Sequence, residues 1–161
     1  MNNHRDRTSM VVESRELQNA MFIGIGNDGR GDDGLGWAFL NAIEQNKNFD
    51  GPAVYRYQLQ IEDAELISRA RRVVFVDAYH QSLPNGYRWQ TCVPAHEVAY
   101  TSHQLSPQTV LFLCKELYEA TPQADLLLIE GCSWDLQLGL SQSAKTNLEK
   151  ALHFFNVTIT C

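Results

Sequence analysis

Residues 21–45 read MFIGIGNDGRGDDGLGWAFLNAIEQ, and this stretch decides the fold. Its first residues, Met21–Ile25, form a short apolar run that is typical of a buried strand. A loop rich in glycine and aspartate follows, and apolar residues then recur at helical spacing from Leu35 to Ile43. A strand, a glycine-rich loop and a helix in this order are typical of α/β proteins.

The rest of the chain repeats this alternation of strands and helices. The pattern predicts further strands at 53–60, 73–78, 87–93 and 126–131, and helices at 64–70, from Ser106 onward and at 141–155. We therefore predict an α/β fold with a mainly parallel sheet covered on both faces. Ligands bind such sheets outside the carboxyl ends of the strands, so the loops at that edge are the candidate functional loops.

Length and composition favour one ordinary domain. A chain of 161 residues buries a core without disulfides, and we expect residues 21–161 to form a single domain behind a loose polar extension, residues 1–20. The net charge of −6 argues against a nucleic-acid binder. No transmembrane run or signal peptide is recognisable, and four scattered cysteines without a C-x-x-C pair fit the reducing cytoplasm.

Gly24, Gly26 and Gly29, at the end of the first strand and in the loop after it, form the pattern G-x-G-x-x-G, which in dinucleotide-binding proteins holds a pyrophosphate. The same turn carries three carboxylates, Asp28, Asp32 and Asp33. Fixed negative charges repel a phosphate, so nucleotide binding is the least favoured function for this loop. A loop that faces a cation fits the residues better.

Three side chains are predicted to meet at the carboxyl edge of the sheet: Asp33, Asp77 and His103. Each has a simpler interpretation, because Asp33 suits a helix cap, Asp77 a turn and His103 a surface loop. Two carboxylates and an imidazole brought together favour a cation or a substrate proton between them. Oxygen and nitrogen ligands of this kind suit zinc or nickel.

Three stretches in this order, GIGNDGRGDDGLG, VVFVDAYHQSLPNG and TSHQLSP, resemble the hydrogenase maturation proteases. The resemblance runs from Met21 to about Phe155 and includes GCSWDLQLGLS before the last helix. It implies a three-layer αβα fold with a twisted, mainly parallel five-stranded sheet, similar to phosphorylase/hydrolase-like folds. It also implies an endopeptidase that removes the C-terminal extension of a nickel–iron hydrogenase large-subunit precursor.

The resemblance assigns roles to particular residues. Asp33, Asp77 and His103 would be the catalytic and metal-contacting residues, which engage nickel already installed in the substrate. No permanent cofactor is implied, although zinc or another divalent ion suits the same residues. Independently of the resemblance, we expect Gly24, Gly26, Asn27 and Gly34 to form the backbone of the substrate cleft, since glycines let the chain turn sharply and approach a docked peptide.

Two further functions use the same residues. One is a self-sufficient metallohydrolase with its own zinc or manganese at Asp33, Asp77 and His103. The other is a non-catalytic relative that binds the hydrogenase subunit or checks its metal. The expected partner is the large-subunit precursor, with no nucleic acid and no membrane. The sequence does not predict the oligomeric state.

Overall fold

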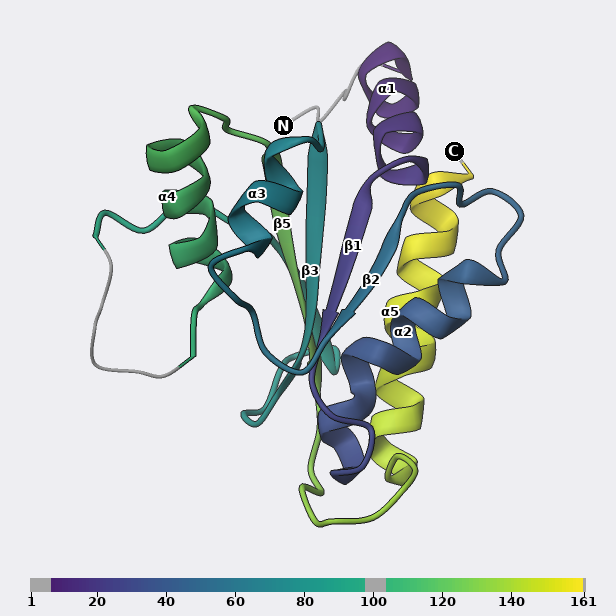
Figure 1. Ribbon diagram of the computed structural model, residues 1–161. Helices are drawn as coiled ribbons and strands as arrows, with labels where there is room; N and C mark the ends of the chain where they lie inside the picture. Colours follow the sequence, from purple (N-terminus) through teal and green to yellow (C-terminus); the bar gives the residue numbers. More distant parts are fainter. Residues whose placement is uncertain (1–6, 98–103, 161) are drawn as a thin grey trace.

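The computed structural model describes residues 7–97 and 104–160. Figure 1 shows a central sheet with helices on either side. The elements follow one another in this order: α1 (Arg7–Gln18), β1 (Met21–Ile25), a 3-10 turn η1 (Gly31–Gly34), α2 (Leu35–Glu44), β2 (Ala53–Arg56), α3 (Asp63–Ser68), β3 (Arg72–Tyr79), β4 (Tyr87–Thr91), α4 (Pro107–Tyr118), β5 (Gln123–Glu130) and α5 (Gln142–Ile159).

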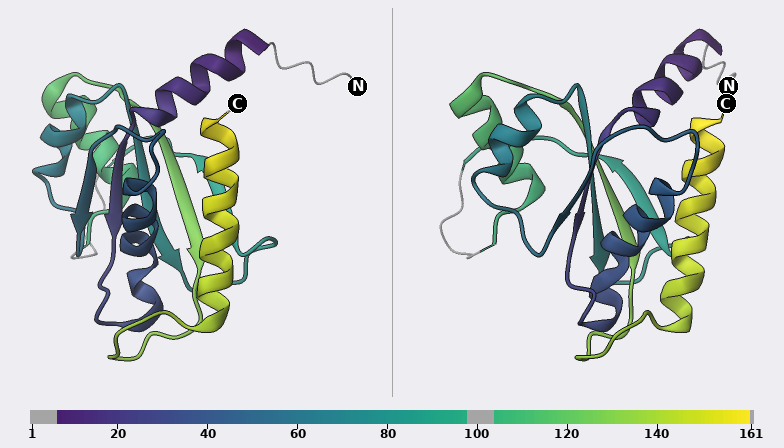
Figure 2. Two further views of the ribbon diagram at one scale, coloured as in Figure 1. Left: turned by 90° about the vertical axis from the view of Figure 1, so that its right-hand side faces the viewer. Right: turned by 45° about the vertical axis from the view of Figure 1, so that its right-hand side comes forward.

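The sheet has five strands in the order β2-β1-β3-β5-β4. The first four strands of this order run parallel, and β4 pairs antiparallel with β5 at the edge. Helices α3 and α4 cover one face, while α2 and α5 cover the other (Figure 2). The prediction of a mainly parallel five-stranded sheet between helices is confirmed.

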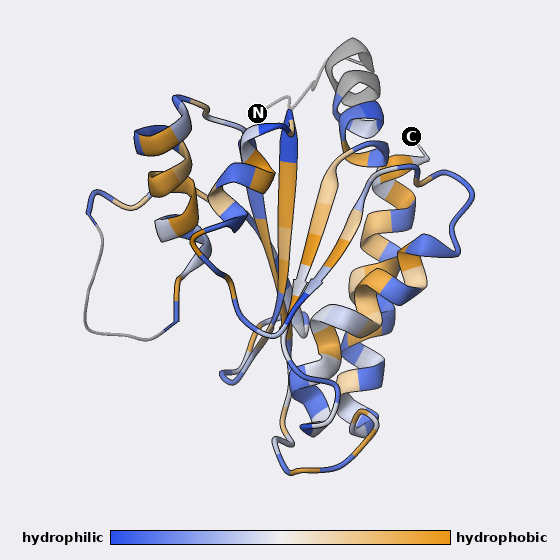
Figure 3. Ribbon diagram, in the orientation of Figure 1, coloured by the Kyte–Doolittle hydropathy of each residue, from blue (hydrophilic) through white to orange (hydrophobic). Residues whose placement is uncertain are grey.

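Strand alternation divides the core into two clusters, one on each face of the sheet. Along β3, Val74 and Val76 join the cluster on the side of α2 and α5. Val73 and Phe75 join the cluster on the side of α3 and α4. Successive strand residues point to opposite faces, so a strand covered on both sides is apolar throughout. Figure 3 shows β1 and most of β3 in orange, between helices that carry both orange and blue residues.

Residues 1–20 were expected to be a loose extension, and this is wrong from Glu13 onward. Leu17 on α1 is 2% exposed and packs in the cluster that contains Phe155 of α5. The Ser14 hydroxyl and the Gln18 amide each donate a hydrogen bond of 2.7 Å to the carbonyl of Ile159. That carbonyl lies in the last turn of α5, where backbone acceptors lack helical partners, so α1 supplies the missing donors.

Of two smaller expectations, one changes and one is confirmed. The strand predicted at 53–60 ends at Arg56, and Leu59 makes only an isolated bridge with Leu105. Helix α4 begins as predicted, because the Ser106 side chain accepts a hydrogen bond from the Thr109 N–H and Pro107 follows. None of the helices in the described ranges is long and apolar enough to cross a membrane.

A close approach of α2 to the sheet positions the loop between β1 and α2. A Cβ atom added at Gly36 would lie 2.6 Å from the Val76 carbonyl oxygen and 2.7 Å from that of Ile25. Both neighbours are backbone atoms in the sheet, which cannot move aside as a flexible side chain does. Glycine at this position therefore lets the first turn of α2 rest directly on β1 and β3.

We expect Gly36→Ala to destabilise the protein by about 2–3 kcal/mol, because overpacking at rigid neighbours forces the helix away from the sheet. Urea unfolding followed by circular dichroism measures this change. Gly29→Ala is the matched control, since its Cβ would meet only the Asn27 side-chain oxygen at 3.1 Å. Equal stability of the two variants would show that α2 does not depend on this contact.

Candidate functional site

Asp77 lies near the carboxyl end of β3, the central strand of the sheet. It stands in register with Ile25, the last residue of β1, and with Leu128 of β5. The buried apolar run of β3 ends at Val76, and Asp77 itself is half-buried. The sequence Val73–Asp77 therefore places a carboxylate where β1 ends and two residues before the ends of β3 and β5.

Asp33 comes to the same edge from the 3-10 turn η1. Its carbonyl accepts a hydrogen bond of 3.2 Å from the Asn27 N–H, which folds the turn back over the end of β1. Asp33 does not cap α2, because the N-cap position is Gly34 and no side chain makes a capping hydrogen bond there. The interpretation of Asp33 as a helix cap is therefore wrong.

Asp33 and Asp77 both have raised pKa values, and the charge of Asp33 contributes to the rise at Asp77. Burial, together with the nearby charge of Asp33, raises the pKa of Asp77 to about 7, against the opposing effect of the Ala78 N–H. Burial also raises the pKa of Asp33, while the Asn27 N–H and the positive charge of Arg30 oppose the rise. A pair of this kind favours a shared proton or a cation between the two groups.

His103 lies outside the described residues, so its place beside Asp33 and Asp77 stays a prediction. Within 7–97 and 104–160, no group of three or more His, Cys, Asp or Glu side chains is arranged to hold a metal ion. The described part of the site therefore consists of two oxygen donors. Protein sites for zinc use three or four ligands, so these two carboxylates need further ligands from elsewhere.

The glycines predicted to form the substrate cleft have close neighbours within the chain itself. Gly26 has φ +142°, and a Cβ there would lie 2.0 Å from the Asp33 carbonyl oxygen. A Cβ at Gly24 would lie 2.8 Å from the Gly36 carbonyl oxygen, and one at Gly34 would lie 2.9 Å from the Asp28 Cα. These glycines let the loop fold onto β1 and α2. Their contact with a substrate, and that of Asn27, stays a prediction.

Most backbone N–H groups of the loop between β1 and α2 already donate hydrogen bonds within the protein. Hydrogen bonds to oxygen atoms of the protein engage the N–H groups of Gly26, Asn27, Gly29, Arg30, Gly31, Asp32 and Asp33. A phosphate-binding loop instead presents several such groups to its ligand. The described geometry agrees with the expectation from charge that this loop does not hold a phosphate.

Asp32 has a structural role that the sequence did not reveal. It is fully buried, and its carboxylate accepts hydrogen bonds from the N–H groups of Cys132, Ser133 and Ser141 at 2.7–2.9 Å. The Ser141 hydroxyl donates a fourth bond of 2.7 Å. Asp32 thus attaches the loop at 131–141 to the turn that carries Asp33.

The electrostatics of Asp32 differ from those of its neighbour Asp33. Burial alone would raise its pKa, but the hydrogen bonds from Cys132, Ser141 and Ser133 together hold the pKa below its usual value. Asp32 is therefore a fixed anion already occupied by protein donors.

The loop at 131–141 borders a small hollow beside η1. The hollow has a volume of about 160 Å³, and its lining includes Gly34, Trp37 and Gly139. The loop also exposes two leucines at its surface, Leu136 at 80% and Leu138 at 85%.

Comparison of the sequence with known proteins gives no match. No protein-family model matches the chain, and no curated protein matches it significantly. Solved structures do match. The chain is similar to the nickel–iron hydrogenase maturation protease HycI from Thermococcus kodakarensis KOD1, with 22% identity, a TM-score of 0.68 and coverage of 89% of this chain and 94% of that one.

Two further structures give the same result. The hydrogenase maturating endopeptidase HybD from E. coli matches with 17% identity and a TM-score of 0.65, covering 88% of this chain and 92% of that one. HybD from Thermococcus kodakarensis, also a nickel–iron hydrogenase maturation protease, matches with 17% identity and a TM-score of 0.59, covering 86% and 97%. The chain therefore has the fold of the hydrogenase maturation proteases, as the three sequence stretches predicted.

Proposed function

We propose that the chain is an endopeptidase that removes the C-terminal extension of a nickel–iron hydrogenase large-subunit precursor after nickel insertion. The observation that carries the proposal is the pair Asp33 and Asp77 at the carboxyl ends of β1 and β3. The fold shared with hydrogenase maturation proteases and the three sequence stretches support it.

Under this proposal, nickel is part of the substrate. A metal already held by the precursor brings its own ligands, so it needs only a few additional donors from the protease. Asp33 and Asp77 would supply oxygen donors, and His103 is the proposed nitrogen donor. Contact with the metal would restrict cleavage to precursors in which nickel insertion is complete.

The chemistry assigned to the site is hydrolysis of a peptide bond. A metal ion near the scissile peptide polarises its carbonyl or lowers the pKa of an attacking water. Before a metal-bearing precursor docks, burial and Asp33 raise the pKa of Asp77 to about 7, so this carboxylate is a stronger base than an ordinary aspartate and is suited to accept a proton from water. Asp77 is therefore the proposed general base, and Asp33 lies where it raises the pKa of Asp77.

The test uses the purified full chain with a hydrogenase large-subunit precursor, either loaded with nickel or metal-free. We expect mass spectrometry to show loss of the C-terminal extension from the nickel-loaded precursor only. Equal cleavage of the metal-free precursor by a chain that retains stoichiometric zinc would instead indicate an independent metallohydrolase. Binding of the precursor without cleavage would indicate a non-catalytic relative.

A further inference from the structure

A hollow of about 370 Å³ lies at the amino ends of β1 and β3, at the edge of the sheet opposite Asp33 and Asp77. Its lining includes four arginines, Arg15, Arg69, Arg71 and Arg72, and we call it the arginine pocket. The chain has a net charge of −6 and only 13 Lys and Arg residues, so four of them at one hollow is a marked concentration. One acidic side chain, Glu16, lines the pocket with them.

Arg72 is the buried member of this group, with 5% of its side chain exposed. Its Nε donates a hydrogen bond of 2.9 Å to Asp125, and its NH2 lies 2.7 Å from the same carboxylate oxygen. Its NH1 is buried, and no described residue accepts a hydrogen bond from it. The Glu16 carboxylate lies 3.6 Å from NH1, which is an ion-pair distance but too long for a hydrogen bond.

Arg72 lines two hollows, the arginine pocket and a second one, and the neighbours of its nitrogen atoms divide between them. Asp125 and Glu13, the partners of Nε and NH2, line a separate hollow together with Trp89. Glu16, the neighbour of NH1, lines the arginine pocket instead. Buried N–H groups nearly always have a hydrogen-bond partner, so a buried NH1 beside a hollow points to a ligand or ion there.

The other three arginines are exposed around this buried donor. Arg69 makes an ion pair with Glu65 at 2.8 Å, but both side chains are more than half exposed, and such pairs are weak. Guanidinium groups bind carboxylate and phosphate oxygens through paired N–H donors, which makes a cluster of them a site for oxyanions.

We propose that the arginine pocket binds a small oxyanion, a phosphate or carboxylate group, with NH1 of Arg72 as the buried donor and Arg15, Arg69 and Arg71 around it. Arg15 comes from α1, whereas the other three follow α3 and begin β3. An oxyanion between them bridges α1 to the body of the domain. Its binding therefore stabilises the folded chain, since a ligand that binds only the folded state raises its melting temperature.

Thermal unfolding of the full chain in inorganic phosphate tests this proposal, with sodium chloride at equal ionic strength as the reference. At ten times the dissociation constant we expect phosphate to raise the melting temperature by about 3–6 °C. Sodium acetate is the second arm, because it offers a carboxylate in place of a phosphate group. The ion with the larger saturable shift identifies the chemistry that the pocket prefers.

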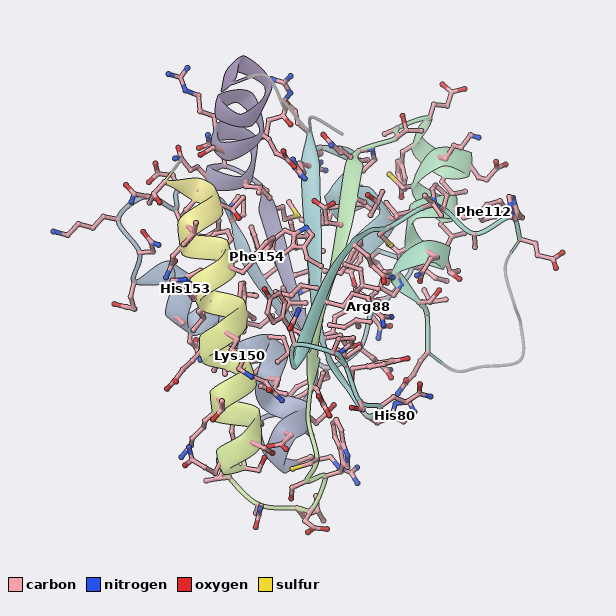
Figure 4. All side chains as sticks on the ribbon, turned by 180° about the vertical axis from the view of Figure 1, so that it is seen from behind. His80, Arg88, Phe112, Lys150, His153 and Phe154 are labelled. Atoms are coloured by element: carbon pink, nitrogen blue, oxygen red, sulfur yellow. The ribbon has the colours of Figure 1, made fainter. Side chains whose placement is uncertain are left out.

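Variants locate the effect. Arg15→Ala and Arg71→Ala each remove one exposed guanidinium, and we expect both to weaken or abolish the shift. Arg88→Ala is the matched control, because Arg88 is an exposed arginine on β4, well away from α1 (Figure 4). Arg72→Lys keeps a positive charge beside Asp125 but removes the paired donors, and it too should lose the shift.

Two results would overturn the proposal: no saturable shift beyond sodium chloride, or the same shift in Arg71→Ala as in Arg88→Ala. The experiment uses no hydrogenase precursor. The arginine pocket can therefore fail while the proposed protease function stands, and the reverse also holds.

Discussion

Asp77→Asn is expected to reduce cleavage of the nickel-loaded precursor by at least about 100-fold, which is the usual contribution of a general base. The substitution keeps the size of the side chain but removes both the proton acceptor and one charged oxygen donor to the metal. Single-turnover cleavage, followed by mass spectrometry, measures the loss. Asp50→Asn serves as the control, because Asp50 is an exposed aspartate beside the amino end of β1.

The fold should survive the Asp77→Asn substitution, for an electrostatic reason. Burial and Asp33 raise the pKa of Asp77 from 3.8 to about 7, so the folded protein disfavours its ionised form. A raised carboxyl pKa means that stability is lost as the pH rises from about 4 through 7. An asparagine has no such loss, so Asp77→Asn should equal wild type near pH 4 and exceed it in stability above pH 7.

An Asp77→Asn variant that still cleaves the precursor at the wild-type rate would remove Asp77 from the mechanism. An inactive variant that is also unfolded would leave the activity result uninformative, and for that reason urea unfolding at pH 4 and pH 8 accompanies the kinetics. Retained fold with lost cleavage is the combination that the proposed mechanism requires.

Asp32→Asn is expected to destabilise the protein by about 3 kcal/mol and lower its melting temperature by about 6–12 °C. The buried carboxylate accepts four hydrogen bonds from the loop at 131–141, two of them from Ser141 at its end. In the Asp32→Asn variant, a side-chain amide nitrogen replaces one carboxylate oxygen. This nitrogen is a donor, so it cannot accept the hydrogen bonds that the surrounding N–H groups donate. Bonds to a charged acceptor are each worth about 1.5–3 kcal/mol, so losing the charge weakens all of them.

The effect of Asp32→Asn should depend on pH in a defined direction. The pKa of Asp32 lies below its usual value, because its hydrogen bonds outweigh the effect of burial. Its stabilisation is therefore fully present above about pH 4 and is lost as the pH falls through the folded pKa. Asp28→Asn, an exposed aspartate of the same turn, is the control. Similar melting temperatures for the two variants at pH 7 would rule out the anchoring role of Asp32.

Much of the fold was predictable because its signals are local. The apolar run Val73–Val76 is buried on both faces, and Ser106 with Pro107 begins α4 as their helix-start chemistry indicates. Helix α1 was missed because its stretch is polar overall and its anchors are few. Only contacts with Ile159, far along the chain, show that Ser14 and Gln18 have partners.

The candidate site was likewise predictable in one part and not in another. Strand ends and loop order predicted that Asp33 and Asp77 share one edge, and the nearby charge of Asp33 contributes to the raised pKa of Asp77. The neighbouring residue Asp32 has the same chemistry in the sequence, yet it is saturated with hydrogen bonds. Which of two adjacent carboxylates faces a ligand depends on the path of the loop at 131–141, and no local pattern encodes that path.

The anchoring of Asp32 also determines when the protein can finish folding during synthesis. The bond between Asp32 and the Ser141 N–H joins residues 109 positions apart. Until the ribosome has released Ser141, the turn next to Asp33 lacks the partners that hold it, even though β1 and β3 are already made. The edge of the sheet that carries both aspartates is therefore completed late, when most of the chain has emerged.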